Sequence, residues 1–303
     1  MVGILGMTRP GDATGTEVSV VVPALNAAAT LALQLDGLAA QDYAGAWEVI
    51  VADNGSTDET RKLVETWTEK FPALRCIVVP TPGVNYARNA GARAARGRLI
   101  LFCDTDDAVE PHWISAMVAA SKRFDVVGGA LEYELLSPPE VPRPHARASS
   151  ELPRVFGIDY AISANMGCAR VAFDTVGGFD ETFGVGGDDV DFSWRAQQAG
   201  FSLGFSADAV VHYRLRGPLG AFARQQYRYA KGDAHLYAKH LRLGELPPRS
   251  LGRQVRAALG DLYDVMRLVP GVGRTKGRWR FVHRLARLVG GVTGALEWGV
   301  FPP

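Results

Sequence analysis

The chain has 303 residues, of which 47% are apolar, and its 33 lysine and arginine residues nearly balance its 32 aspartate and glutamate residues. This is an ordinary composition for a soluble enzyme of one large domain, or of one domain with an appendage. Three cysteines exclude a disulfide framework and a cysteine-based zinc site. We see no signal peptide and no apolar run long enough to span a bilayer, so we expect a cytoplasmic protein.

The first half of the chain alternates apolar runs with helical patterns. Residues 1–16 lack periodicity and are expected to be disordered. Asn26 is expected to cap the first helix, and Ser56 and Glu59 have the spacing of a capping box. Successive strand–helix units predict right-handed crossovers and a parallel sheet. The predicted strands cover 17–22, 47–52, 74–79 and 98–103, and the helices between them begin near 26, 57 and 85.

The second half is denser in glycine and ends in helical spacing. We expect a mobile loop over 137–150, which is rich in proline and polar residues. The remaining predicted strands cover 125–133, 201–206 and 209–213. The predicted helices cover 111–123, 218–241, 251–268 and 276–298, and one more helix ends at Gly200.

Three carboxylates follow the buried strand predicted over 98–103, namely Asp104, Asp106 and Asp107. In an open α/β sheet, ligands bind beyond the carboxyl ends of the strands. Like charges crowded there are relieved by a hard divalent cation, which often also binds a substrate's phosphates. An acidic turn or a helix cap is the alternative interpretation of these residues.

A second acidic group follows a glycine-rich run, Gly184-Val185-Gly186-Gly187. Asp188, Asp189 and Asp191 stand at the start of a predicted helix, where the macrodipole favours acids without any further role. The glycines favour the functional interpretation, because they allow close approach to a ligand.

Together, several motifs between about residues 17 and 240 resemble the family 2 glycosyltransferases with the GT-A fold. Five motifs in the right order carry the resemblance: 22–26 (Val-Pro-Ala-Leu-Asn), 53–58 (Asp-Asn-Gly-Ser-Thr-Asp), the DXD motif 104–106 (Asp-Thr-Asp), 176–180 (Val-Gly-Gly-Phe-Asp) and 187–191 (Gly-Asp-Asp-Val-Asp). Leu25 departs from the aromatic residue that is frequent at its position, and Asp188 from the more usual glutamate.

The resemblance implies a Rossmann-like, mostly parallel central sheet flanked by helices, with a catalytic domain over 17–215 and a C-terminal helical region over 216–303. It implies Mn²⁺ or Mg²⁺ held by Asp106, with Asp104 on the ribose or on a metal-bound water. The residues expected to bind the nucleotide-sugar donor are Pro23, Ala24, Asn26, Asp53, Asn54, Arg88, Asp104, Thr105 and Asp106.

The implied reaction is inverting transfer of a hexosyl or related group from a UDP-, GDP- or dTDP-sugar to an acceptor hydroxyl or other nucleophile. Asp189 is the implied general base, while the choice between Asp189 and its neighbour Asp188 stays open. His212 ends a strand and is either a further metal ligand or a structural residue. Arg88 is either a phosphate ligand at a helix start or a solvated helix arginine.

From Arg249 to Gly290 the chain has ten arginine and lysine residues and only two aspartates. This basic region forms either an amphipathic surface lying peripherally on the inner face of a membrane, or helices packed on the catalytic domain. Nucleic acid is not an expected partner, because no base-reading module accompanies the charge. The acceptor, whether glycan, lipid-linked sugar, peptide or small metabolite, has no sequence signature that we can identify.

Two alternative functions remain at this stage. A nucleotidyltransferase would also gather phosphates and metal, but the lysine-bearing phosphate loop is missing near the first strand. A non-catalytic nucleotide-sugar-binding scaffold would not need both Asp106 and a base. An oxidoreductase is disfavoured because Pro23-Ala24-Leu25-Asn26 replaces the Gly-x-Gly-x-x-Gly turn.

Overall fold

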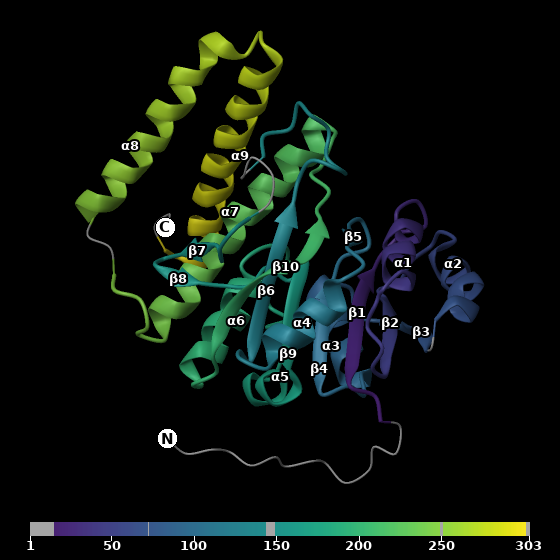
Figure 1. Cartoon of the computed structure of the whole chain (residues 1–303). Coiled ribbons are helices and arrows are strands. Elements are labelled where there is room, and N and C mark those ends of the chain that lie inside the picture. Colours follow the sequence, from purple (N-terminus) through teal and green to yellow (C-terminus); the bar gives the residue numbers. More distant parts are fainter. Residues whose placement is uncertain (1–14, 72, 144–148, 249–250, 301–303) are drawn as a thin grey trace.

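The computed structural model describes residues 15–71, 73–143, 149–248 and 251–300. Most of the segment 1–16 that was expected to be disordered, and part of the expected loop 137–150, lie outside these ranges. Within them, a curled central sheet is covered by helices on both faces, and a long helical arm stands at one side (Figure 1).

The central sheet has eight strands in the order β3-β2-β1-β4-β9-β6-β10-β5. β1, β2, β3 and β4 are parallel, as expected, and so are β6 and β10. The strands are β1 (Val18–Ala24), β2 (Trp47–Asp53), β3 (Leu74–Val78), β4 (Leu99–Cys103), β5 (Ala108–Val109), β6 (Val126–Glu132), β9 (Asn165–Ala169) and β10 (Leu203–His212), and a separate small sheet joins β7 (Arg154–Val155) and β8 (Ile158–Asp159).

The middle of the sheet differs from the prediction. β9 runs antiparallel between β4 and β6, although its sequence contains a glycine and no alternation. It is held there by Asn165, whose side-chain amide donates to the carbonyls of Ala130 and Ala209, both at 2.8 Å. The two short strands expected over 201–213 form the single β10, which carries an irregularity between Ser206 and Val210.

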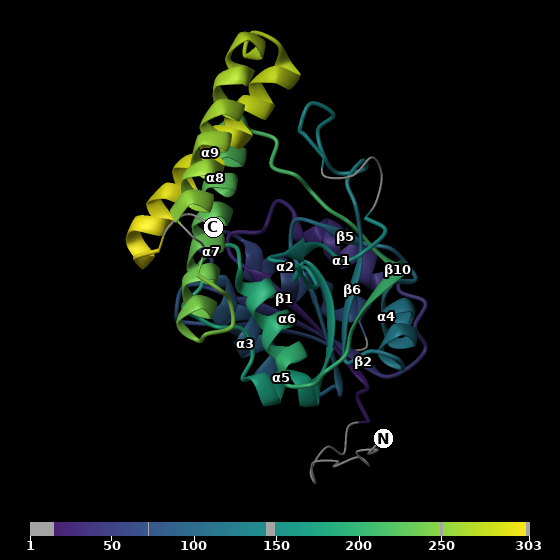
Figure 2. The same cartoon turned by 90° about the vertical axis from the view of Figure 1, so that its left-hand side faces the viewer.

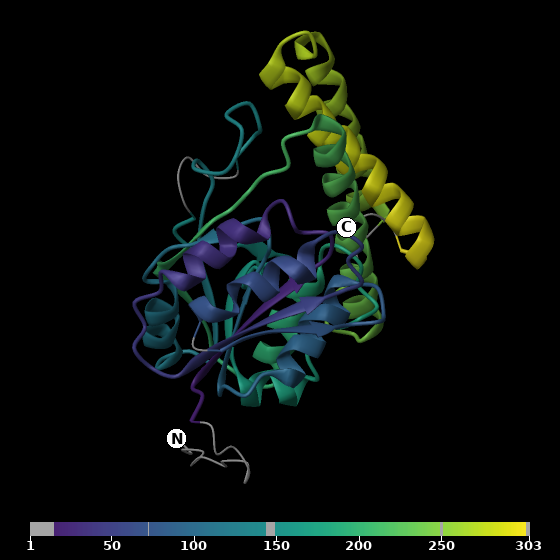
Figure 3. The same ribbon diagram turned by 90° about the vertical axis from the view of Figure 1, so that its right-hand side faces the viewer.

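Helices form a layer on each face of the sheet (Figures 1 and 3). The apolar faces of α1 (Leu31–Ala39), α2 (Thr60–Trp67) and α4 (Trp113–Ser121) pack into one buried cluster. A second cluster on the other face joins α3 (Val84–Ala94), α5 (Arg170–Val176) and α6 (Asp188–Gln198), with the rings of Phe102, Phe173, Phe179 and Phe192 in contact. Burial of these faces supplies the hydrophobic stabilisation of the domain.

Two predicted helix caps are wrong. α1 begins at Leu31, and Asn26 stands before it with a φ of 50°. Its side chain accepts a hydrogen bond from the backbone of Thr57 at 2.8 Å, while its own backbone N–H donates to Ser56 at 2.8 Å. Ser56 and Asn26 therefore join the loops after β1 and β2 and do not cap helices. Short polar side chains bond nearby loops as readily as helix ends, which explains the error.

Three helices follow the sheet: α7 (Leu219–Arg242), α8 (Leu251–Leu268) and α9 (Thr275–Trp298). The 3-10 turn η2 (Val269–Gly271) lies between α8 and α9, and another, η1 (Thr68–Lys70), follows α2. α9 packs along α7, and α8 and α9 form a hairpin whose turn projects away from the sheet (Figures 1 and 2). Among the described helices, none combines the length and hydropathy needed to cross a membrane.

Candidate active site

The site lies at the carboxyl ends of β1 and β4, which are parallel neighbours. The chain leaves β4 through Asp104, Thr105, Asp106 and Asp107, and each of the three carboxylates there offers an oxygen within 4.8 Å of the others. The backbone N–H of Arg214 donates to Asp107 at 2.7 Å, and the side chain of Arg214 donates to the carbonyl of Asp106. The segment that follows β10 therefore holds this acidic turn in place.

The electrostatics of this turn favour a bound cation. Burial, and then the charge of Asp104, raise the pKa of Asp106. Burial raises the pKa of Asp107 well above its ordinary value, with the other two carboxylates adding to the effect. One oxygen of Asp107 is buried and accepts no hydrogen bond within the described residues. Clustered oxygen donors with an unsatisfied member fit a hard divalent ion.

Arg88 connects this turn to the second acidic group. Its guanidinium is only 6% exposed and lies 3.1 Å from Asp104 and 2.9 Å from Asp188. Burial by itself would lower the pKa of Arg88, but the carboxylates around it raise the pKa overall. Arg88 is thus a buried, paired cation on α3, and the interpretation as a solvated helix arginine is wrong.

Glycines shape the start of α6. Gly186 and Gly187 have φ of 96° and 84°, a conformation that other residues rarely adopt. A Cβ on Gly187 would lie 3.0 Å from the carbonyl oxygen of Gly232 on α7. The tight turn therefore lets α6 begin directly against α7, with Asp188 and Asp189 in its first turn.

The three aspartates at this helix start have different environments. Burial, followed by the charge of Asp188, raises the pKa of Asp189 to about 7. The backbone N–H of Ser163 donates to Asp189 at 3.3 Å. Burial would also raise the pKa of Asp191, but hydrogen bonding to His240 and the charges of Arg195 and Lys239 lower it to about 2. Asp191 therefore anchors α6 to α7, while Asp189 is a carboxyl whose charge is poorly stabilised.

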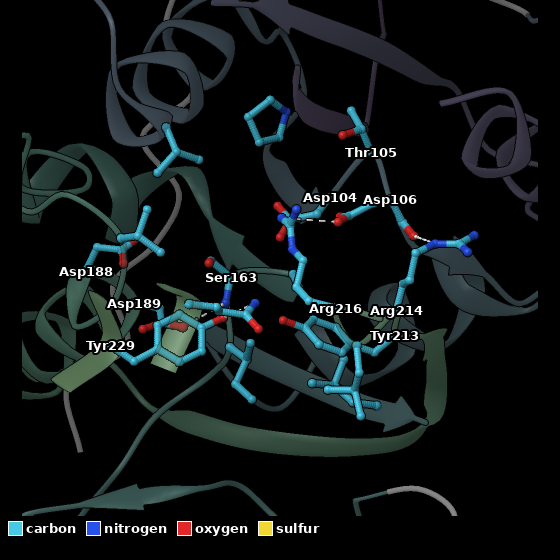
Figure 4. Close-up of a pocket in the computed structure, with 18 of the residues that line it drawn as sticks. Asp104, Thr105, Asp106, Ser163, Asp188, Asp189, Tyr213, Arg214, Arg216 and Tyr229 are labelled. Carbon is cyan, nitrogen blue, oxygen red and sulfur yellow. Dashed lines mark hydrogen bonds and ion pairs between the residues drawn. The ribbon is translucent and has the colours of Figure 1, made fainter. Parts of the chain in front are cut away.

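Both acidic groups face one cavity of about 800 Å³. Figure 4 shows Asp104 and Asp106 on one side and Asp188 and Asp189 on another, with Arg216 extending toward Asp106. Of the residues predicted to act here, those that line the cavity are Pro23, Asn26, Arg88, Asp104, Thr105, Asp106, Asp188 and Asp189.

Four predicted residues are not brought to the cavity wall. Ala24 is buried at the end of β1. Asn54 uses its amide to hold the turn after β3, donating to Thr81 at 2.7 Å and accepting from Gly83 at 2.6 Å. Asp53 is fully buried and lies 3.4 Å from Arg61. The oxygen that lies 3.4 Å from Arg61 accepts no hydrogen bond within the described residues, so the ion pair is its contact behind the wall.

His212 is the fourth of these residues. Its ring nitrogens lie 2.8 Å from Glu110 and 2.7 Å from Glu132, so both are already paired. Among the described residues, the cluster of potential metal ligands consists of Asp104, Asp106 and Asp107, and His212 is not part of it. The structure therefore gives His212 a pairing role between β10, β6 and the segment after β5.

The wall of the cavity opposite the acidic turn was only partly predicted from the sequence. It comes from the segment after β10 and from α7 and α9, whose side chains have no short sequence motif. Burial raises the pKa of Tyr229 to about 12, so its hydroxyl stays protonated. An ion pair of 2.5 Å joins Asp233 on α7 to Arg287 on α9. Lining residues to which the sequence assigned no individual role include Tyr133, Tyr160, Ser163, Tyr213, Arg214, Arg216, Asp233 and Arg287.

Two family models match this chain. The model described as glycosyl transferase family 2 matches residues 19–175, and that of glycosyl transferase family group 2 matches residues 160–259. Glycosyltransferase AglE of Haloferax volcanii is 26% identical over 234 residues, covering 73% of this chain and 74% of the relative. Validoxylamine A glucosyltransferase of Streptomyces hygroscopicus subsp. jinggangensis is 30% identical over 230 residues, covering 63% of this chain. This chain spans 54% of that relative's length.

Solved structures share the fold. Mannosyltransferase PcManGT from Pyrobaculum calidifontis, in complex with GDP-Man and Mn²⁺, has a TM-score of 0.64 at 18% identity, covering 95% of this chain and 91% of that one. S. aureus TarS 1–349 in complex with UDP-GlcNAc has a TM-score of 0.56 at 17% identity, and the match covers 94% of this chain and 93% of that one. The expected GT-A type architecture is thereby confirmed.

Proposed function

The chain belongs to glycosyl transferase family 2 and is a glycosyltransferase, and from this premise we propose a metal-dependent, inverting reaction at the cavity. In it, a nucleotide-diphosphate sugar donates its sugar to an acceptor hydroxyl or another nucleophile. One observation carries the proposal: the acidic turn after β4 and the pair Asp188–Asp189 face the same cavity, linked through Arg88. Family membership disfavours the nucleotidyltransferase and scaffold alternatives.

The donor end of the cavity is the acidic turn. Asp104 and Asp106, with Asp107 beside them, would hold Mn²⁺ or Mg²⁺. When bound, the ion offsets the negative charge of the departing diphosphate. A relative of the same fold is complexed with GDP-Man and Mn²⁺ and another with UDP-GlcNAc, which supports this class of donor. Arg216 is 54% exposed and lies 3.4 Å from Asp106, within reach of the same phosphates.

The nucleoside would lie along Pro23, Asn26 and Thr30, which line the cavity beyond β1. Asp53 has one carboxylate oxygen that accepts no hydrogen bond and lies 3.4 Å from the half-exposed Arg61, and this oxygen suits the imide N–H of a pyrimidine base. Because Asp53 is fully buried, reaching it requires the loop after β1 to move, and we retain this contact as a prediction. Leu25 is 57% exposed at the same edge and offers an apolar surface for the base.

Asp189 is the proposed general base. The acceptor oxygen forms a bond to the anomeric carbon while the bond from that carbon to the diphosphate oxygen breaks, and the acceptor proton passes to Asp189. A single displacement inverts the anomeric configuration. The raised pKa of Asp189 makes its carboxylate a stronger base than an ordinary aspartate. Asp188 is already paired with Arg88, and this favours Asp189 as the proton acceptor.

The acceptor would enter from the wall formed by α7 and α9. Tyrosine rings provide stacking surfaces for a sugar there, and the Asp233–Arg287 pair provides hydrogen-bonding groups for its hydroxyls. Glycans, lipid-linked sugars, peptides and small metabolites all satisfy the chemistry. Peripheral contact with the inner face of a membrane through the C-terminal helices remains part of the proposal.

Isothermal titration with UDP, GDP and dTDP, each with and without Mn²⁺, tests the donor site. We expect one nucleotide to bind in a metal-dependent manner, and we expect this binding to be lost in Asp106→Ala. Asp36→Ala on the exposed side of α1 is the matched control and should bind like the wild type. Binding of none of the three nucleotides to the folded wild-type protein would contradict the proposed site.

A further inference from the structure

The outer surface of α8 carries an unusual number of exposed apolar side chains. Leu259, Leu262, Tyr263 and Met266 are 61%, 47%, 62% and 63% exposed. Their spacing of three and four residues puts them on one side of the helix, where they form a continuous apolar stripe. Val265, on another side of α8, is buried, so the hairpin is packed through a different face.

α9 has a second stripe of the same kind. Leu285, Val289, Val292 and Leu296 are 38–79% exposed and recur at helical spacing. The packed side of α9 is distinct from it. On that side Trp298 stacks on His235 with ring centroids 3.6 Å apart, and Gly290 lies against the backbone of Tyr227. The stripe is therefore not the face through which Trp298 and Gly290 contact α7.

The charges beside these stripes have one sign. Between Asp264 and Glu297 the sequence has seven arginine and lysine residues and no acidic residue. Two of the seven, Arg284 and Arg287, pair with Asp264 and Asp233. The other five are exposed and make no ion pair within the described residues: Arg267, Arg274, Lys276, Arg278 and Arg280. They surround the turn of the hairpin, which projects farthest from the sheet (Figure 2).

We propose that the two apolar stripes and these five cations dock the α8–α9 hairpin on an anionic lipid bilayer. Apolar side chains enter the boundary between headgroups and acyl chains, and the cations interact with lipid phosphates. A second copy of the chain fits this surface less well, because a two-fold interface would bring the same cations together.

Docking bears on the acceptor, and here the inference rests on the proposed function. α9 presents Arg287 to the cavity and its apolar stripe to the outside. A bilayer held on the stripe would therefore lie beside the wall at which the acceptor enters. The acceptor class that this arrangement suits is a saccharide attached to a membrane lipid.

Flotation with vesicles tests the docking without any need for activity. We expect the wild-type protein to float with vesicles of phosphatidylcholine and phosphatidylglycerol but not with phosphatidylcholine vesicles, and to dissociate at high salt. Charge reversal in Arg278→Glu/Arg280→Glu should weaken binding roughly tenfold or more, because each cation near such a surface contributes appreciably. Leu262→Ser/Met266→Ser should weaken it comparably by removing apolar burial.

Matched variants on the catalytic domain control for charge and for surface apolarity. Arg96→Glu/Lys122→Glu and Leu33→Ser/Val171→Ser change exposed residues away from the hairpin and should bind vesicles like the wild type. Equal loss in these controls would overturn the proposal, as would no flotation or equal flotation with neutral vesicles. A soluble dimer that Leu262→Ser/Met266→Ser converts to monomer, with no vesicle binding, would overturn it in favour of a second copy.

Nucleotide titration on the same samples separates the two proposals. Vesicle binding without nucleotide binding would contradict the donor site and leave the docking surface intact. Nucleotide binding without vesicle binding would contradict the docking surface only. The acceptor inference requires faster transfer to a lipid-linked saccharide in anionic vesicles than to the same saccharide free in solution, and equal rates would overturn it.

Discussion

A nitrogen of the Arg88 guanidinium lies 2.9 Å from a carboxylate oxygen of Asp188, although the two residues are 100 positions apart in the sequence. Arg88 belongs to α3 and Asp188 to α6, two helices on the same face of the sheet. The same guanidinium contacts Asp104 at 3.1 Å. One buried cation thus couples the end of the cavity proposed for the donor to the end that carries the proposed base.

Arg88→Lys is expected to reduce transfer about 100-fold, because an ammonium cannot hold both carboxylates in the planar geometry that a guanidinium provides. Arg88→Met should also lower stability by about 3–5 kcal/mol, since it leaves buried carboxylates without their partner. The rate of nucleoside diphosphate release measures the effect on transfer, and thermal unfolding measures the effect on stability. Arg93→Lys, on the exposed side of the same helix, should change neither. Full activity in Arg88→Lys would argue against a positioning role.

Asp189→Asn should stabilise the protein near neutral pH, and Asp188→Asn should do so less. The pKa of Asp189 is about 7 in the folded protein, against an ordinary value of 3.8, so its ionisation disfavours the folded state. This penalty is absent below pH about 4, grows up to pH about 7 and is constant above it. Asp189→Asn removes it and should stabilise the protein at pH 8 by on the order of 2–4 kcal/mol.

Burial also raises the pKa of Asp188, so Asp188→Asn likewise removes a disfavoured charge. It leaves Arg88 with one carboxylate fewer, however, and should therefore stabilise the protein less than Asp189→Asn does. For activity, we expect Asp189→Asn to lower the rate at least about 100-fold with nucleotide binding unchanged, as removal of a general base does. Unfolding by denaturant at pH 4 and pH 8, with activity measured in parallel, checks both effects. A variant Asp189→Asn that retains wild-type activity would assign the base elsewhere.

The pH dependence of the rate should report the same carboxyl. A general base must be ionised to accept the acceptor proton, so the rate is expected to rise with pH and level off above about 7, the pKa of Asp189. Initial rates from pH 5 to 9 at saturating donor and metal test this dependence. A rate that is already at its plateau at pH 5 would mean that the acting base has an ordinary pKa.

Mn²⁺ should stabilise the protein through the acidic turn. At a concentration 100 times its dissociation constant, a ligand that binds only the folded state adds about 2.7 kcal/mol. Because Asp106 and Asp107 have raised pKa values, their protonation should shrink this gain as the pH falls from 8 to 5. Thermal unfolding with Mn²⁺ and with a chelator measures the difference.

Asp107→Asn gives this test a specific control. Without metal the variant should be more stable than the wild type near neutral pH, because burial and the neighbouring carboxylates disfavour the charge of Asp107. Addition of Mn²⁺ should raise the stability of Asp107→Asn by less than it raises that of the wild type. Asp36 is exposed on α1, and Mn²⁺ should stabilise the Asp36→Asn variant as much as it stabilises the wild type. An undiminished gain in Asp107→Asn would restrict the metal site to Asp104 and Asp106.

Two adjacent glycines of α9 provide a further test. A Cβ on Gly290 would lie 2.3 Å from the carbonyl oxygen of Tyr227, whereas nothing lies within 4 Å of a Cβ on Gly291. Gly290→Ala should force α9 away from α7 and cost about 1–3 kcal/mol. Gly291→Ala should be neutral or stabilise by up to about 1 kcal/mol, through helix propensity. Thermal unfolding of both variants checks the contact, and equal effects would mean that α9 is not packed as described.

The strands and loops that could be predicted from the sequence are those whose signals are local. The buried runs over β1, β2 and β4 and the carboxylates after β4 are contiguous, so period and composition reveal them. The order of five short motifs then indicated the family. The acidic pair at the start of α6 was visible for the same reason, because two aspartates after a glycine run form a local signal.

The contacts that these residues make could not be predicted in the same way, because they depend on the folded arrangement of distant segments. β9 enters the middle of the sheet because Asn165 satisfies carbonyls on β6 and β10, and no local pattern encodes that pairing. His212 ends β10, a position that suited a metal ligand in the sequence, yet both of its nitrogens pair with glutamates from other segments. The pKa shifts of Asp189 and Asp191 have opposite directions. Burial raises the pKa of Asp189, whereas groups on α7 help to lower that of Asp191. Such environments arise from residues distant in the sequence, so they exist only once the chain has folded.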